Sequence, residues 1–87
     1  MTMKLTILYF ARLREALGRD RETVEVPQEV TTVAHLRAWL VARGAPFDAA
    51  FGEIRRIRAA VNQSMVNEDA ALADGAEVAF FPPVTGG

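Results

Sequence analysis

Apolar and polar residues alternate along several stretches of the chain. Alternation with a period of two predicts strands, because successive side chains of a strand point to opposite faces of a sheet. In the first stretch, Leu5, Ile7 and Tyr9 share one face. The last stretch should end before Pro82, since proline has no N–H for the ladder. The predicted strands are residues 4–9, 21–27, 57–61 and 77–81, with a short strand around Met65 and Val66.

Two segments between these strands have helical spacing. Phe10, Leu13 and Leu17 predict a short helix directly after the first strand, with Gly18 as its C-terminal cap. A longer helix is predicted at residues 33–43, where an apolar stripe recurs every three to four positions. That stripe consists of Val33, Leu36 and Leu40.

The flanks of the longer helix are less regular. Either Thr31 or Thr32 offers a side-chain oxygen for its N-cap. After the helix, residues 45–52 are expected to form an irregular connection or a short helical turn.

The order of elements predicts an α+β fold. One main helix cannot cover both faces of a sheet, so a mixed sheet wrapped around that helix is expected. The chain has 87 residues, which is enough for one domain. We assign residues 1–81 to this domain and residues 82–87 to an extended tail.

Composition excludes several classes of protein. The chain has no cysteine, which excludes disulfides, thiolate metal sites and a cysteine nucleophile. Its apolar runs are too short for a membrane span, and its N-terminus lacks the pattern of a cleaved signal peptide, so we expect a cytoplasmic protein that does not bind membranes. A net charge of −1 gives no general attraction to nucleic acid.

Side chains within the domain form no recognisable catalytic or metal-binding motif. His35 and Ser64 stand without partners at motif spacing, and the pair Glu68–Asp69 more plausibly solvates a loop than binds a metal. Basic residues gather in two groups, which are either a docking patch for an acidic partner or an ordinary charged surface. These groups are Arg12, Arg14, Arg19 and Arg21, and then Arg55, Arg56 and Arg58.

The most informative stretch is the end of the chain, FFPPVTGG. Strand alternation turns Phe80 toward the core and Phe81 outward, where Phe81, Pro82 and Pro83 would form an apolar partner surface. The two prolines favour an extended exit. Gly86 and Gly87 have no Cβ, so they can thread a narrow channel and present the terminal carboxylate to a bound reagent. A carboxylate becomes electrophilic once it is joined to AMP, and a sulfur donor can then convert it to a thiocarboxylate.

Three stretches resemble one family closely: LYFARLREALG (8–18), AAVNQSMV (59–66) and LADGAEVAFFPPVTGG (72–87). The chain is similar over nearly its whole length to the small, sulfur-carrier subunits of molybdopterin synthase. This resemblance implies the ubiquitin-like β-grasp fold.

The resemblance also implies a mechanism. A ubiquitin-activating-type adenylyltransferase would use ATP to adenylate Gly87, and a sulfurtransferase system would supply sulfur for its thiocarboxylate. The segment Val84, Thr85, Gly86 and Gly87 would then enter the active site of the large synthase subunit, in a heterotetramer with two copies of each subunit. There it would give sulfur to cyclic pyranopterin monophosphate. The carrier would bind no cofactor stably and would have no catalytic side chains of its own.

Three other functions stay open. A sulfur carrier for another pathway, such as thiazole synthesis, shares the fold and the Gly-Gly end but generally lacks the FFPPV exit. A ubiquitin-like modifier would form isopeptide bonds, and Lys4, the single lysine, argues against poly-chains but not against single conjugation. A plain interaction module would have an inert tail.

Overall fold

The computed structural model describes residues 2–54 and 56–82. These residues form five strands and three helices. Along the chain they are β1 (Thr2–Tyr9), α1 (Ala11–Leu17), β2 (Arg21–Pro27), α2 (Val33–Val41), α3 (Phe47–Glu53), β3 (Arg58–Val61), β4 (Ser64–Val66) and β5 (Glu77–Phe81).

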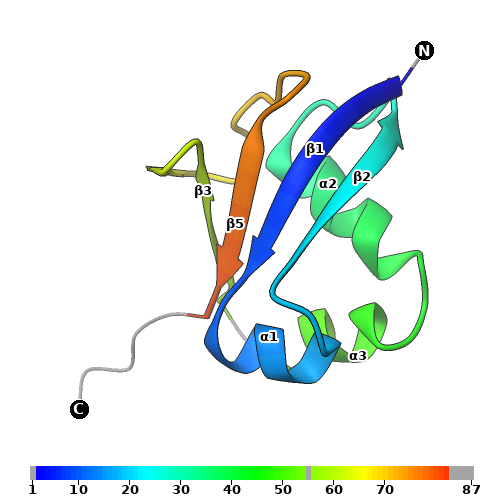
Figure 1. Ribbon diagram of the computed structural model, residues 1–87, viewed down its shortest axis with the longest axis vertical. Helices are drawn as coiled ribbons and strands as arrows, with labels where there is room; N and C mark the ends of the chain where they lie inside the picture. Colours follow the sequence, from blue (N-terminus) through cyan, green and yellow to red (C-terminus); the bar gives the residue numbers. More distant parts are fainter. Residues whose placement is uncertain (1, 55, 83–87) are drawn as a thin grey trace.

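The strands form one mixed sheet in the order β2-β1-β5-β3-β4. The central pair, β1 and β5, is parallel, and the other neighbouring pairs are antiparallel. Figure 1 shows α2 lying across one face of the sheet, with α1 and α3 near the end at which β1 and β5 finish. The predicted α+β fold with a mixed sheet and one main helix is therefore confirmed.

The core lies between the sheet and the helices. Leu5, Ile7 and Tyr9 of β1 are buried together, as their alternation predicts. The stripe of α2 is also completely buried, because its spacing of three to four residues keeps it on the side of the helix that faces the sheet. Burial of such side chains is the main favourable contribution to folding in a domain of this size.

The first helix differs from the prediction at its start. Phe10 does not join the buried stripe; it takes an extended backbone at the N-cap, and its side chain is 45% exposed. Only Leu13 and Leu17 are buried in α1. Gly18 caps the helix as predicted, in the left-handed conformation with φ 71°, and its N–H donates to the carbonyl of Arg14.

The second helix and the segment after it are defined more sharply than the sequence predicted. Thr32, not Thr31, is the N-cap: its hydroxyl oxygen accepts from the N–H of His35 at 3.2 Å. The helix ends at Val41 rather than at residue 43. The stretch 45–52, expected to be an irregular connection or a short helical turn, overlaps α3, whose Phe47 and Ala50 are buried. With only two core side chains in seven residues, α3 has too weak a helical periodicity to be predicted from the sequence pattern.

Candidate functional site

The last described residue, Pro82, is where the predicted tail begins. The tail residues that the sequence singles out, Pro83, Val84, Thr85, Gly86 and Gly87, lie outside the described residues. Their proposed threading and their covalent chemistry therefore stay predictions. The structure does define the point from which they leave the domain.

This exit is fixed by the two strands beside β5. Phe80 is paired with Tyr9 of β1, and the N–H of Phe10 donates to the carbonyl of Phe80 at 3.2 Å. On the other side, Phe81 is paired with Arg58 of β3. Because β5 is paired with β1 as far as Phe80 and with β3 as far as Phe81, the sheet fixes the position of the end of this strand.

The two phenylalanines at the exit face opposite ways. Phe80 is fully buried and packs edge-on against Phe51 of α3, with ring centroids 5.5 Å apart. Phe81 is half-buried on the outer face of the sheet, the face away from the core. The predicted orientation of both rings is confirmed, and Phe81 is available for contact at the base of the tail.

The register of the strands places further apolar residues beside Phe81. Leu8 pairs with Ala79, Ala79 with Ala60, and Ala60 with Met65, so one apolar row crosses four strands of the outer face. Met65 is 56% exposed. We call this row, together with Phe81 and the exposed Phe10, the outer patch.

The sequence did not predict most of the outer patch; it predicted only Phe81, Pro82 and Pro83 as partner contacts. Its members come from four separate stretches of sequence, and alternation alone does not show which of them are opposite one another. The available signal was the apolar residue at alternate positions of each strand, such as Leu8 on the predicted polar side. An apolar surface of this kind usually marks a binding site for another protein.

Arginines border the outer patch on two sides. Arg21 pairs with Leu8 across β1 and β2, and Arg58 pairs with Phe81 across β3 and β5. Next to the exposed ring of Phe10 is a hollow of about 250 Å³ lined in part by Leu8, Arg14 and Arg21. A partner with an apolar centre and an acidic rim would complement this surface.

Behind the exit, a polar cluster joins the sheet to the helices. The Tyr9 hydroxyl donates to Glu22 Oε2 at 2.6 Å, and Arg43 binds the same oxygen at 3.0 Å. Arg19 binds the other oxygen at 3.2 Å. Arg43 also lies over the ring of Phe47, 4.3 Å from its centroid.

The cluster shifts the pKa of both acidic groups. Burial, and then the hydrogen bond to the Glu22 carboxylate, raise the pKa of Tyr9 far above its usual range. Burial alone would raise the pKa of Glu22, but hydrogen bonds from Arg43 and Tyr9 outweigh it, and the pKa of Glu22 is lowered. The sequence reasoning missed this cluster because its members are far apart in the chain.

His35 and Ser64, the two candidate catalytic residues, lie on the surface without catalytic partners among the described residues. His35 is exposed at the start of α2, where its Nδ1 accepts from the N–H of Thr31 at 3.3 Å. Ser64 is exposed at the start of β4. Across residues 2–54 and 56–82 we find no group of three or more His, Cys, Asp or Glu side chains placed to hold a metal ion. No helix in this part of the chain is long and apolar enough to cross a membrane.

Comparison with protein families matches the chain to the ThiS family over residues 7–87. The chain belongs to this family. Its relatives include the molybdopterin synthase sulfur carrier subunit of Escherichia coli, which is 45% identical over 83 residues, covering 95% of this chain and 99% of that protein. The subunit of the same name from Mycobacterium tuberculosis is 38% identical over 86 residues, covering 98% and 99%. The predicted resemblance to the sulfur-carrier subunits is thus confirmed.

Solved structures share the fold of this chain. SAMP1 from Haloferax volcanii superposes with a TM-score of 0.77 at 27% identity, covering 97% of this chain and 99% of that one. A putative molybdopterin converting factor subunit 1 from Pyrococcus furiosus gives 0.70 at 28% identity, covering 94% and 99%. A ubiquitin from Caldiarchaeum subterraneum gives 0.57 at 19% identity over the full length of both chains, which supports the fold alone. The predicted β-grasp fold is therefore confirmed.

Proposed function

We propose that this ThiS-family chain is the sulfur carrier subunit of molybdopterin synthase. The observation that carries the proposal is the 45% identity to a subunit of that name, which extends over 95% of the chain. The family match itself runs to Gly87, so it includes the tail. The described structure adds a fixed exit at Phe81 and Pro82 from which such a tail would leave.

The working atom of the carrier is the terminal carboxylate of Gly87. An oxygen of this carboxylate attacks the α-phosphate of ATP, pyrophosphate leaves, and an acyl adenylate forms. A persulfide sulfur of the sulfurtransferase then attacks the carbonyl carbon, AMP leaves and an acyl disulfide forms. A second thiol of the sulfurtransferase system attacks the donor-side sulfur of this disulfide, which releases the Gly87 thiocarboxylate and leaves a disulfide on the donor. The large subunit would bind Val84, Thr85, Gly86 and Gly87 and pass the sulfur to cyclic pyranopterin monophosphate.

This chemistry needs three protein partners. An adenylyltransferase supplies ATP-dependent activation, a sulfurtransferase supplies sulfur, and the large synthase subunit accepts it in a heterotetramer with two copies of each chain. A solved structure from Helicobacter pylori is a complex of subunits 1 and 2 of the molybdopterin-converting factor. We assign the outer patch and the exit, with Phe81, Pro82 and Pro83, to docking of the large subunit. We place the reaction in the cytoplasm, where ATP is available.

A second candidate function is protein modification. Its support is the similarity to small archaeal modifier proteins, such as the Haloferax volcanii modifier protein 1 that superposes with a TM-score of 0.75 at 25% identity. In that function an amine of a target would attack the acyl adenylate, an isopeptide bond would form and AMP would leave. A carrier for thiazole synthesis would be charged with sulfur in the same way as the synthase subunit but would not need the large subunit.

Mass spectrometry of the chain purified from its own cells separates these functions. A sulfur carrier should show the mass gain of one sulfur replacing one oxygen, located on Gly87. A modifier should instead yield branched peptides in which Gly87 is joined to a lysine of another protein. Co-purification of the large synthase subunit with the sulfur-charged chain separates the synthase subunit from a thiazole carrier. Branched peptides without any sulfur-charged chain would contradict the proposed function.

A further inference from the structure

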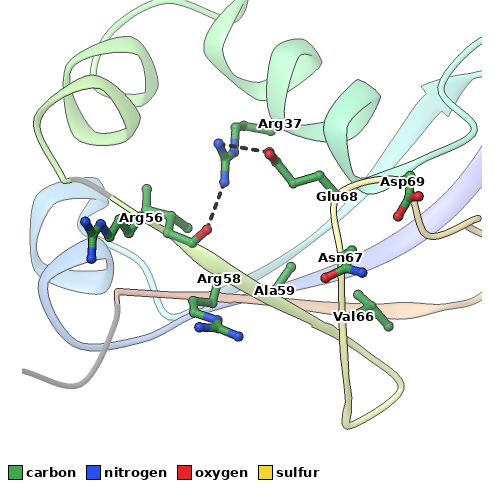
Figure 2. Close-up of a pocket in the computed structure, with 9 residues that line it drawn as sticks. Arg37, Arg56, Arg58, Ala59, Val66, Asn67, Glu68 and Asp69 are labelled. Atoms are coloured by element: carbon green, nitrogen blue, oxygen red, sulfur yellow. Dashed lines mark hydrogen bonds and ion pairs between the residues drawn. The ribbon is translucent and has the colours of Figure 1, made fainter.

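A groove lies beside the tail exit, between α2 and the hairpin of β3 and β4. It has a volume of about 510 Å³. Ala59 and Val66, which are paired across the hairpin, lie along it, and Arg37 reaches it from α2 (Figure 2). Its charged lining consists of Arg37, Arg56, Arg58, Glu68 and Asp69.

Arg37 is held in place by two contacts, but one of its hydrogen-bond donors has no acceptor within the described part of the chain. One of its terminal nitrogens donates to the carbonyl of Ile57 at 2.9 Å, and the other binds Glu68 at 3.0 Å (Figure 2). Its Nε is buried and has no hydrogen-bond partner among the residues that the structure describes. A buried donor without an acceptor is unfavourable, so an oxyanion brought close to this guanidinium would be stabilised.

Arg56 and Arg58 add positive charge that the domain leaves uncompensated. Both side chains are exposed, and neither forms an ion pair within residues 2–54 and 56–82. Arg19 and Arg43, by contrast, both bind Glu22. Within the groove Arg37 is paired with Glu68, and the guanidinium groups of Arg56 and Arg58 lie at its rim, pointing away from Arg37 (Figure 2). These two arginines outnumber the remaining carboxylate, that of Asp69, so the groove and its rim together are net positive. Guanidinium groups are well suited to bind further carboxylates because their donors match the carboxylate geometry.

The groove is continuous with the exit through Arg58. This residue borders the groove, and its side chain, opposite Phe81 in the pairing of β3 with β5, lies on the outer face of the sheet, away from Arg37 (Figure 2). A protein that covers the outer patch and receives the tail therefore comes within reach of the groove without a change in the fold. Charge complementarity then requires that the part of this protein beside the groove be acidic.

We propose that this groove is a second recognition site, which takes an acidic segment of the large synthase subunit while the outer patch and the tail are engaged. The inference rests on the proposed function, because that function names the partner. It assigns Arg56 and Arg58 to contact with the partner's carboxylates and Arg37 to alignment of the groove. The contact increases the rate and the strength of docking and does not take part in the sulfur transfer.

Binding of the large subunit tests this inference with a double variant, Arg56→Gln with Arg58→Gln. We expect affinity to fall roughly tenfold or more at low salt, mainly through slower association, and the difference to shrink as salt screens the charges. Lys4→Gln removes one charge near the far end of β1 and should stay within about twofold of the wild type. Thermal melts should be unchanged in both. The inference would be overturned if the double variant bound the large subunit with wild-type affinity. It would also be overturned if the double variant bound only the adenylyltransferase more weakly and the large subunit normally.

A second measurement tests whether the groove binds carboxylates without using the large subunit. It remains informative if the large subunit fails to bind the wild-type chain, which by itself would refute the proposed function. Hexaglutamate is titrated into the isotope-labelled wild-type chain while the Nε–H resonances of the arginines are followed by NMR. We expect saturable shifts at Arg37, Arg56 and Arg58, and much smaller ones at Arg12. Shifts of equal size at all these arginines, or none, would show that the groove has no selective affinity for carboxylates.

Discussion

Phe80 and Phe81 are adjacent in the chain but lie on opposite faces of the sheet, Phe80 fully buried against Phe51 and Phe81 half-buried within the outer patch. The two rings therefore have separate tasks at the exit of the tail. One fixes the end of β5 to the core, and the other is available to a partner. This division allows stability and docking to be changed independently at neighbouring positions.

Truncation of each ring should have a different effect. Phe81→Ala should fold and melt nearly as the wild type but lose roughly thirtyfold or more in affinity for the large subunit, as aromatic anchors at the centre of interfaces do. Phe80→Ala should lower the free energy of unfolding by about 3–5 kcal/mol, because it leaves a cavity in the core. Thermal melts and calorimetric titration of both variants check this. Unimpaired binding by Phe81→Ala would remove Phe81 from the interface.

If the outer patch binds the large subunit, Met65, at the end of the row that begins at Leu8, should contribute to the binding. Met65→Asp places a charge on the apolar surface and should weaken binding of the large subunit by about tenfold or more. Stability should change little because Met65 is 56% exposed. Gln28→Asp, at an exposed position after β2, is the matched control and should bind normally. Equal binding by the two variants would limit the interface to the exit.

The sequence predicts some features of the exit and the outer patch but not others, and the difference has a physical reason. Alternation within a strand gave the facing of Phe80 and Phe81, and the αL preference of glycine gave the cap at Gly18, because both depend on local geometry. The row from Leu8 to Met65 depends on register between strands that are distant in the chain, which no local pattern encodes. The Tyr9–Glu22 contact depends on tertiary packing in the same way.

The cluster around Glu22 predicts a dependence of stability on pH. The pKa of Glu22 is lowered on folding, so its contribution is present above the unfolded value, near 4.5, and is lost as pH falls through the folded value. Glu22→Gln should therefore be less stable than the wild type near neutral pH, and the two should converge in acid. Urea unfolding at several pH values measures this. A stability difference that does not change with pH would contradict the ionised state assigned to Glu22.

The same cluster predicts a change at high pH through Tyr9. Because the pKa of Tyr9 is raised on folding from 10.0, its neutral form stabilises the domain below that value, and this contribution is lost as pH rises through the folded pKa. Tyr9→Phe keeps the ring but cannot ionise, so its stability should decline less than that of the wild type above pH 10. Urea unfolding in alkaline buffer is the check, and parallel curves for both proteins would disprove the assignment.

Gly86 is predicted to be at a narrow part of the path into the partner. Gly86→Val adds a branched side chain and disfavours positive φ, so adenylation, sulfur delivery or both should fall strongly while circular dichroism is unchanged. Thr85→Val places the same side chain one residue earlier and should be tolerated better. Normal activity of Gly86→Val would show that the tail is not confined there.

The central claim, that Gly87 carries the sulfur, is tested most directly by a single-turnover reaction. The chain is charged with ATP, the adenylyltransferase and a sulfur donor, freed of these reagents, and mixed with the large subunit and cyclic pyranopterin monophosphate. We expect molybdopterin to form while intact-mass spectrometry shows Gly87 changing from the thiocarboxylate to the carboxylate. A chain lacking Gly87 should fold normally and form no product, because its terminal carbon is displaced by about 3.5 Å. Product formation by the shortened chain, or without loss of sulfur from Gly87, would contradict the account.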